Sequence, residues 1–184
     1  MKTFVPPLLF IWETLKIVVL ALLIVIPIRY FLFQPFFVRG QSMEPNFENG
    51  DYLIIDELSY RFSGPQRGDV VVFRYPYNRS QSYIKRLIGL PGETIEIKDN
   101  KIIIYSDGQA RVLDETAYLS VNVQTTGELR IRLDENEYFV LGDNRSVSSD
   151  SRTWGPLKRG DIIGKVFLRA WPFRALAKIE TPAY

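Results

Sequence analysis

An uncharged apolar run of twelve residues, Ile17 to Ile28, stands near the N-terminus and divides this chain into two unlike parts. As a helix the run covers roughly 18 Å, which is shorter than a hydrocarbon core of about 30 Å. Residues 30–37 continue the apolar character and lengthen the segment. We therefore predict one membrane span over residues 14–34, with Pro27 kinking it and Arg29 reaching an interface.

A cleavable signal peptide and a buried core helix are the alternatives to this anchor. A signal peptide requires a small-x-small site after the apolar run, but residues 33–39 are mostly bulky. We favour the anchor over both alternatives. Charge does not give its orientation, because Lys2 and Lys16 precede the run whereas Arg29 and Arg39 follow it.

Beyond Gly50, short apolar runs alternate with turn signals. Asp99-Asn100 and Asp107-Gly108 are typical of hairpin turns. The strands that we expect are 51–55, 69–73, 83–88, 94–97, 101–105, 128–133, 137–141, 161–163 and 164–170. The pattern predicts a mainly β fold, in which an antiparallel and partly closed β-barrel-like domain follows the transmembrane helix.

The stretch 98–134 is more polar and loses this rhythm, so we interpret it as a smaller inserted β subdomain. The main β-domain then consists of residues 35–97 and 135–170. Residues 1–34 form an N-terminal tip and the anchor, and residues 171–184 form a C-terminal tail.

The tail begins with Trp171-Pro172-Phe173, close to the basic residues Arg169, Arg174 and Lys178. Aromatic rings with basic neighbours suit the headgroup region of a bilayer. Packing of the same rings in the core or on the surface is an equally good interpretation.

Composition excludes several kinds of chemistry. The 184 residues contain no histidine and no cysteine, which rules out Ser-His-Asp and Cys-His catalysis, disulfides and imidazole or thiolate metal sites. We find no acidic cluster spaced for a metal, and nothing indicates a cofactor. A net charge of +2, without a dense basic stretch, does not indicate nucleic acid as a partner.

A serine nucleophile in such a chain needs a base other than histidine. Ser42 directly follows the apolar segment, and Lys85 lies between apolar neighbours on the expected strand 83–88. Burial lowers the pKa of a lysine, because it disfavours the charged form. A neutral Lys85 can then take the proton of the Ser42 hydroxyl.

Four blocks in order give this pair a context. The first block is Gln-Ser-Met-Glu-Pro at 41–45 with Gly50-Asp51, and the second is Arg-Gly-Asp with the apolar strand that follows it, at 67–73. The third block, at 83–93, contains Tyr-Ile-Lys-Arg and Leu-Pro-Gly-Glu. The fourth block, at 142–155, contains Gly-Asp-Asn-Arg, Ser148, Asp-Ser-Arg and Trp-Gly. In these blocks the chain resembles the type I signal peptidase (leader peptidase) family of serine-lysine proteases. The resemblance covers roughly residues 34–168.

The resemblance implies that Ser42 is the nucleophile and Lys85 the general base. It implies that Ser148 orients the lysine and that Asp150 and Arg152 form an ion pair that braces the site. We interpret residues 143–145 as turn chemistry, since Asp and Asn favour turns.

Two positions depart from the family pattern. Gly40 stands where some members carry a hydroxyl residue that helps to bind the oxyanion, so a side-chain donor is in doubt there, whereas the Ser42 amide remains. Ser146-Val147 stands where many members have Asp-Asn, and we interpret this as a tolerated turn change.

By the same resemblance, the substrates are exported preproteins, cut after small residues in an Ala-x-Ala pattern. We expect the substrate to add as a strand beside residues 82–85. Its side chains would enter shallow pockets formed by Val38, Gly40, Phe47, Tyr83 and Ile84. Gly40 would leave room for close approach of the substrate.

The resemblance also implies a single-pass protein in a bacterial-type plasma membrane or an organellar equivalent. Its N-terminus would be cytoplasmic and its catalytic domain extracytoplasmic, with the lipid bilayer as a partner. Two other functions stay open: a serine-lysine peptidase with a narrower substrate, and a catalytically silent, membrane-anchored domain that binds exported chains. The sequence does not give the oligomeric state.

Overall fold

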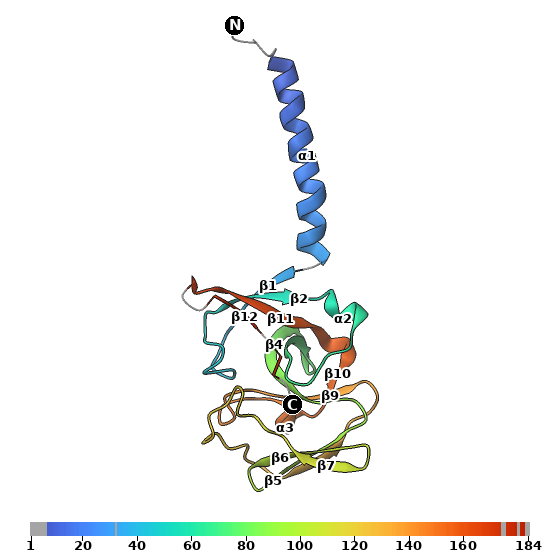
Figure 1. The fold of residues 1–184 in the computed structure, drawn as a ribbon, viewed down its shortest axis with the longest axis vertical. Helices are drawn as coiled ribbons and strands as arrows, with labels where there is room; N and C mark the ends of the chain where they lie inside the picture. Colours follow the sequence, from blue (N-terminus) through green and yellow to red (C-terminus); the bar gives the residue numbers. More distant parts are fainter. Residues whose placement is uncertain (1–6, 32, 174–175, 180, 183–184) are drawn as a thin grey trace.

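The computed structural model describes residues 7–31, 33–173, 176–179 and 181–182. Helix α1 (Pro7–Phe31) extends away from a β-rich body that contains nearly all the other elements (Figure 1). Glu13 and Lys16 form an exposed ion pair on this helix at 2.7 Å. The side chain of Arg29 and residue Arg174 lie outside the part that the structure describes, as do the first residues of the predicted N-terminal tip.

The helix ends earlier than the predicted span of 14–34. Strand β1 (Phe33–Phe37) takes over and pairs with β2 (Tyr52–Asp56), with Phe36 opposite Leu53. Over the described residues, no helix reaches the combination of length and hydropathy that a membrane span requires. The predicted anchor is therefore not confirmed.

Eight strands form the main sheet, in the order β1-β2-β11-β3-β4-β9-β10, with β12 paired to β11. Besides β1 and β2, these are β3 (Val70–Tyr75), β4 (Asn78–Gly89), β9 (Glu137–Leu141), β10 (Leu157–Lys158), β11 (Ile162–Trp171) and β12 (Ala177–Lys178). All of the neighbouring strands pair antiparallel, as predicted. The predicted partial closure into a barrel is not confirmed: in the described residues β1 and β10 end the order without pairing to each other, so no closed barrel forms.

A second sheet has the order β7-β6-β5-β8 and lies at the end of the body farthest from α1 (Figure 1). Its strands are β5 (Thr94–Lys98), β6 (Lys101–Ser106), β7 (Gln109–Val112) and β8 (Leu129–Arg132). It begins at Thr94, whereas the expected insertion spans 98–134. Positive φ angles at Asp99, Asn100 and Asp107 confirm the two predicted hairpin turns.

Apolar side chains of the two sheets share one core. Ile95 and Ile104 from the second sheet pack in the same cluster as Ile88 and Phe139 from the main sheet. The remaining elements are short: α2 (Ser59–Phe62), α3 (Ser151–Trp154) and the 3₁₀ turn η1 (Arg159–Asp161). The shared core holds the second sheet against β4 and β9, the strands that flank the site described next.

Candidate active site

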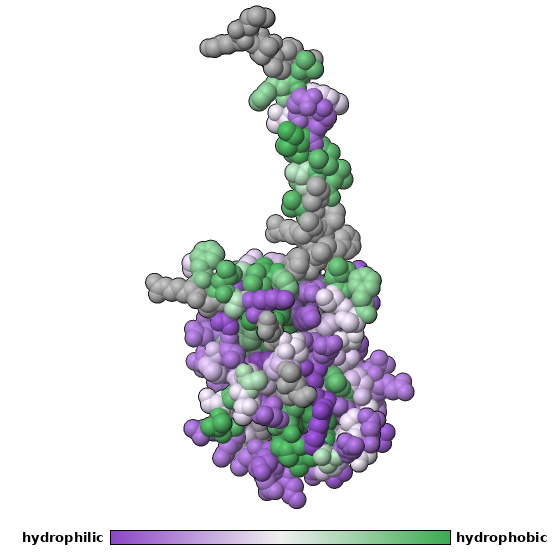
Figure 2. Space-filling view, in the orientation of Figure 1, coloured by the Kyte–Doolittle hydropathy of each residue, from purple (hydrophilic) through white to green (hydrophobic). Residues whose placement is uncertain are grey.

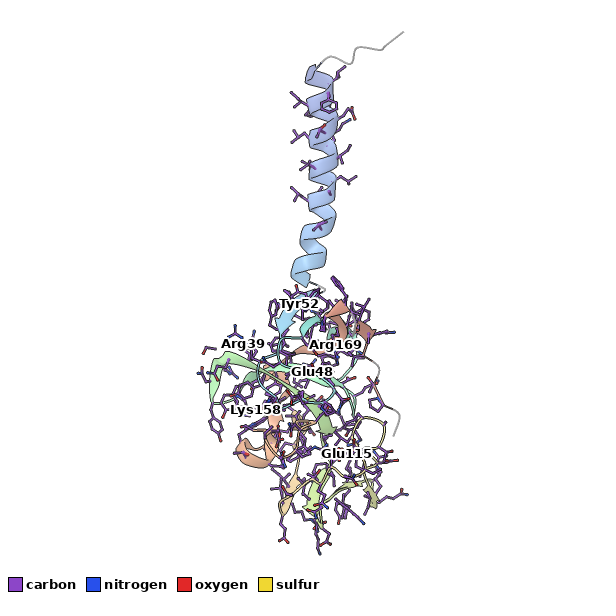
Figure 3. The ribbon with its side chains drawn as sticks, turned by 90° about the vertical axis from the view of Figure 1, so that its left-hand side faces the viewer. Arg39, Glu48, Tyr52, Glu115, Lys158 and Arg169 are labelled. Atoms are coloured by element: carbon purple, nitrogen blue, oxygen red, sulfur yellow. The ribbon has the colours of Figure 1, made fainter. Side chains whose placement is uncertain are left out.

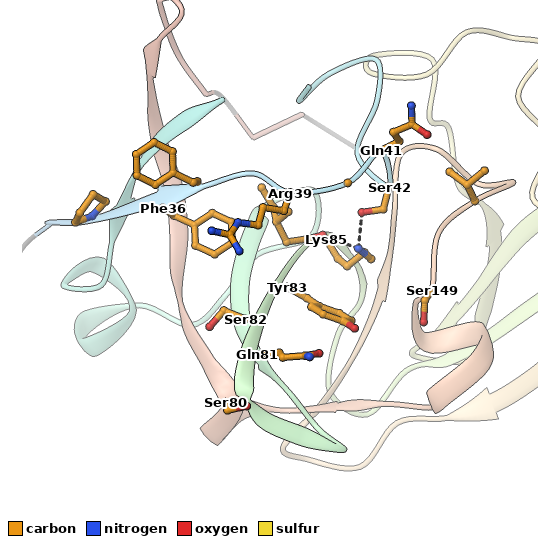
Figure 4. Close-up of a pocket in the computed structure, with 15 residues that line it drawn as sticks. Phe36, Arg39, Gln41, Ser42, Ser80, Gln81, Ser82, Tyr83, Lys85 and Ser149 are labelled. Atoms are coloured by element: carbon orange, nitrogen blue, oxygen red, sulfur yellow. Dashed lines mark hydrogen bonds between the residues drawn. The ribbon is translucent and has the colours of Figure 1, made fainter. Parts of the chain in front are cut away.

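The turn segment between β1 and β2 brings Ser42 against Lys85 of β4. The Nζ atom of Lys85 lies 2.7 Å from Oγ of Ser42, and the two side chains point toward each other (Figure 4). Nζ also donates a hydrogen bond to the carbonyl oxygen of Ile84 at 2.8 Å. The structure therefore brings together the nucleophile and the base that the sequence predicts.

Lys85 is 3% exposed, and this burial lowers its pKa to about 8. The nearby carboxylates of Asp150 and Asp143 act in the opposite direction, because a negative charge favours the ammonium form. Burial prevails, so near neutral pH a useful fraction of Lys85 is the free amine. A free amine at 2.7 Å from the hydroxyl can accept its proton.

If Lys85 acts as a neutral base, cleavage should become faster as pH rises. If the free amine of Lys85 is the active form, kcat/KM rises with pH, about tenfold per unit well below 8, and levels off above the pKa of about 8. Initial rates on one peptide substrate between pH 6 and 9.5 measure this. A rate that is flat down to pH 6, or that falls as pH rises through 8, contradicts a neutral lysine base.

Ser148 lies beside the dyad, but not in the expected contact. Its Oγ is buried and has no hydrogen-bond partner within the described residues, whereas the second bond of Lys85 goes to Ile84. A Cβ atom added to Gly142 would overlap both Ser148 Oγ and the carbonyl oxygen of Ser42. Gly142 is thus the point where the backbone of the fourth block packs closely against Ser42 and Ser148.

Asp150 and Arg152 form the predicted ion pair. Asp150 is fully buried at the start of α3 and accepts two bonds from the guanidinium of Arg152, at 2.8 and 2.9 Å. It also accepts from the backbone N–H of Gly142 at 3.1 Å, and Arg152 donates to the carbonyl of Arg145 at 2.7 Å. The pair therefore fixes the loop that lies against Ser42.

Turn chemistry does not account for Asp143, so that interpretation is wrong. Its carboxylate is buried and takes bonds of 2.8 and 2.7 Å from Nε and Nη2 of Arg86. Asn46 donates to the same carboxylate at 2.8 Å. Since Arg86 follows Lys85 on β4 and Asn46 follows Ser42 in the turn, this buried pair ties both halves of the dyad to one loop.

Arg145 is also more than a turn residue. Its guanidinium is buried, pairs with Glu115 at 2.8 Å and bonds the hydroxyl of Thr125. Its Nε donates to the carbonyl of Gly142 at 2.9 Å. Glu115 belongs to the segment between β7 and β8, in the part of the body remote from α1 (Figure 3). Arg145 thus connects the site to the inserted segment.

The acidic residues near the dyad are engaged with cations. Asp143 pairs with Arg86 and Asp150 pairs with Arg152. In the described part of the chain, no three His, Cys, Asp or Glu side chains gather closely enough to hold a metal ion.

A cleft of about 710 Å³ opens onto the dyad. Residues 35–37 and 39–42 form one wall, residues 80–85 the other, and Val147 and Ser149 complete the lining (Figure 4). Both walls present an open strand edge in the described structure, because β1 pairs only with β2 and β4 meets β9 only from Arg86 onward. An extended peptide fits such an arrangement by adding as a strand.

The five expected pocket residues divide into two groups. Gly40, Tyr83 and Ile84 line the cleft. Val38 and Phe47 do not: each is 2% exposed and packs in the hydrophobic core with Ile84, so their expected place on the pocket surface is wrong. They belong to the same buried cluster as Ile84, which lines the cleft. Gly40 adopts a φ of +89°, a conformation that favours glycine.

Comparison with known proteins places the chain in a family. The family described as "Signal peptidase, peptidase S26" matches residues 11–171. Probable signal peptidase I-1 of Synechocystis is 37% identical over 170 residues, covering 89% of this chain and 84% of that protein. Signal peptidase IB of Staphylococcus aureus is 31% identical over 173 residues, covering 85% and 87%. A solved structure of a signal peptidase I from Enterococcus faecalis is 37% identical, covers 56% of this chain and 97% of that one, and gives a TM-score of 0.45. The chain belongs to the signal peptidase family, peptidase S26.

Proposed function

We infer that this protein is a serine endopeptidase that removes N-terminal signal peptides from exported preproteins. The observation that supports this most directly is the contact of 2.7 Å between Ser42 and the buried amine of Lys85, at the end of a cleft with two open strand edges. The relatives named signal peptidase supply the substrate class.

The reaction follows from the two side chains. The neutral amine of Lys85 removes the hydroxyl proton of Ser42 as Oγ attacks the scissile carbonyl. The backbone N–H of Ser42 is the donor that we propose for the developing oxyanion. The ammonium of Lys85 then returns the proton to the leaving amine, and the same residue activates a water molecule that hydrolyses the acyl-enzyme.

We further propose that Ser148, Asp150 and Arg152 support this chemistry. The ion pair and its bond to the Gly142 amide hold the loop beside the dyad. The hydroxyl of Ser148, which has no hydrogen-bond partner among the described residues, is available to bond the lysine when substrate excludes water. The main sheet is the catalytic domain in this proposal, and the second sheet is an insertion within it.

The cleft is our proposed site for the signal-peptide side of the substrate. A strand laid along residues 80–85 sends alternate side chains into the wall formed by Tyr83 and Ile84. Ile84 is only 4% exposed and backed by a close-packed core, so the space it leaves is small. This supports a preference for alanine-sized residues.

Substrate preference tests this function. A preprotein with alanine at the first and third positions before the scissile bond should be cleaved at least about tenfold faster than one with leucine at either position, because a bulky group meets a packed wall. Gel or mass-spectrometric assay of both substrates measures it. Equal cleavage of the leucine substrates contradicts the proposed pocket, and no cleavage of any of them contradicts the function.

Membrane attachment through α1 is the part of the proposal that concerns localisation: a single pass in a bacterial-type membrane, with the catalytic domain extracytoplasmic. The outward-facing side chains of the helix from Leu9 to Leu23 are largely apolar. Exposed aromatic residues lie at the end of the body nearest the helix, where Figure 2 shows hydrophobic patches; Phe37, Trp171 and Phe173 are 60%, 52% and 73% exposed. Flotation with lipid vesicles, with and without residues 1–31, tests this: vesicle binding that survives the truncation unchanged would contradict an anchoring role for α1.

A further inference from the structure

A second cavity lies beside the turn that carries Ser42, and two of the residues that follow Ser42 line it. It measures about 440 Å³ and is bounded by residues 44–45, 122–124 and 143–146. The turn around Ser42 and the loop after Gly142 line both cavities: residues 41–42 and Val147 face the cleft, whereas residues 44–45 and 144–146 face the second cavity. The hydrogen bond from Asn144 N to Ser42 O, at 3.0 Å, joins these two segments between the cavities.

The order of these elements indicates which part of a substrate each cavity would hold. The cleft includes Pro35 to Phe37, which follow α1 at once, so it serves the part of a substrate that approaches from the side of the helix. A chain lying in the cleft reaches Ser42 and must continue past it. The second cavity adjoins the same turn and loop, so it is available to the residues that come after the scissile bond.

Among the described residues, the charged side chains that line this cavity differ in whether they have an ion-pair partner. Its charged lining residues are Glu44, Asp143 and Arg145. Asp143 is neutralised by Arg86, and Arg145 by Glu115. Glu44 is partly buried, and in the described structure its carboxylate has neither an ion-pair partner nor a hydrogen bond. Its negative charge is left to act on whatever occupies the cavity.

The inserted segment supplies the outer wall. Residues 122–124 come from the connection between β7 and β8, and the neighbouring Thr125 is buried and bonded to Arg145. The same guanidinium bonds the carbonyl of Gly142, beside the nucleophile. This wall is thus fixed to the catalytic loop, which makes the cavity a built feature of the site.

We propose that the second cavity binds the first two residues after the scissile bond, and that Glu44 favours a basic side chain there and disfavours an acidic one. The proposal rests on the proposed function and adds selection on the mature side of the cut. The cleft selects small side chains before the scissile bond, whereas this cavity selects side chains after the bond by their charge. An ion pair with a partly buried carboxylate is of modest strength and is weakened by salt.

The test uses three substrates that are identical up to the scissile bond and carry Lys, Gln or Glu at the second position after it. For wild type we expect kcat/KM to be about tenfold higher with Lys than with Glu at low salt, since attraction is replaced by repulsion. Glu44→Gln should bring the ratio to within about twofold of one, and Glu44→Lys should invert it. Glu48→Gln is the matched control: it removes the same charge from an exposed position outside both cavities and should keep the wild-type ratio.

A wild-type ratio near one, or a ratio that Glu44→Gln leaves unchanged, overturns the proposal. Binding to the inactive variant Ser42→Ala separates this outcome from failure of the proposed function. Peptides that begin at the cut, such as Ala-Lys-Ala-Ala and Ala-Glu-Ala-Ala, are titrated while the amide signals of residues 122–124 and 144–146 are followed by NMR. Tighter binding of the lysine peptide supports the cavity whether or not any preprotein is cleaved, and equal binding refutes it.

Discussion

Lys85→Met should abolish cleavage and at the same time make the protein more stable. The substitution keeps the length of the side chain but removes the amine that lies 2.7 Å from the hydroxyl of Ser42, so we expect a loss of at least about 10³-fold in kcat/KM. The lowering of the pKa of Lys85 from 10.5 to about 8 means that burial of this lysine reduces the free energy of unfolding at pH 7 by about 3 kcal/mol. Methionine avoids that cost, and we expect a gain of about 1–3 kcal/mol after the lost bonds to Ser42 and Ile84 are subtracted.

The sign of the pH dependence distinguishes this effect from ordinary repacking. Between the native pKa of about 8 and the unfolded value of 10.5, the unfolded state binds more protons, so the stability of wild type rises with pH. The advantage of Lys85→Met should be full below pH 8 and shrink toward pH 10.5. Urea unfolding of both proteins at pH 7 and pH 10 measures it. A methionine variant that is less stable at pH 7 contradicts a costly buried lysine.

Gly142→Ala should have the second-largest effect. The added methyl group would overlap the hydroxyl of Ser148, in the loop that the Asp150–Arg152 pair holds, and the carbonyl of Ser42, which accepts a hydrogen bond from that loop. We expect about 1–3 kcal/mol of destabilisation from overpacking and a loss of at least about 100-fold in activity, because displacement of Ser42 spoils its alignment with Lys85. Activity assays and thermal unfolding on the same sample separate the two effects.

Gly160→Ala is the matched control, because nothing lies within 4 Å of a Cβ atom built at Gly160 and its φ is not positive. It should keep wild-type activity and stability to within about 0.5 kcal/mol. If Gly142→Ala behaves like Gly160→Ala, the packing of Gly142 under the nucleophile does not constrain the dyad.

Much of the fold was predictable because its signals are local. Glycine-aspartate pairs and alternating apolar residues marked most of the strands, and Asp99-Asn100 marked a hairpin that adopts the positive φ angles of such a turn. Strand β1 was not predicted, since Phe33 to Phe37 continue an apolar helix and only pairing with β2 makes them a strand. Closure of the sheet depends on which strands meet at its ends, and no local pattern carries that information.

In the site, too, the features that short sequence patterns mark were predictable, whereas contacts between distant residues were not. The dyad was predictable chiefly from the four blocks that resemble a known family, since a lone serine and a lone lysine are weak signals even in a chain without histidine or cysteine. The Arg86–Asp143 pair was not, since its partners are 57 positions apart and each looks like a surface charge. Val38 and Phe47 were expected as bulky pocket walls, but large apolar side chains tend to be buried and both lie in the core.

Cleavage of an Ala-x-Ala preprotein by wild type, Ser42→Ala and Ser63→Ala, with the product masses determined, tests the central claim most directly. Ser63 is an exposed serine outside the cleft and serves as the control. We predict that wild type and Ser63→Ala cut after the second alanine, and that Ser42→Ala, folded, yields no product. Cleavage by Ser42→Ala at the wild-type rate and site would contradict the assignment of Ser42 as the nucleophile.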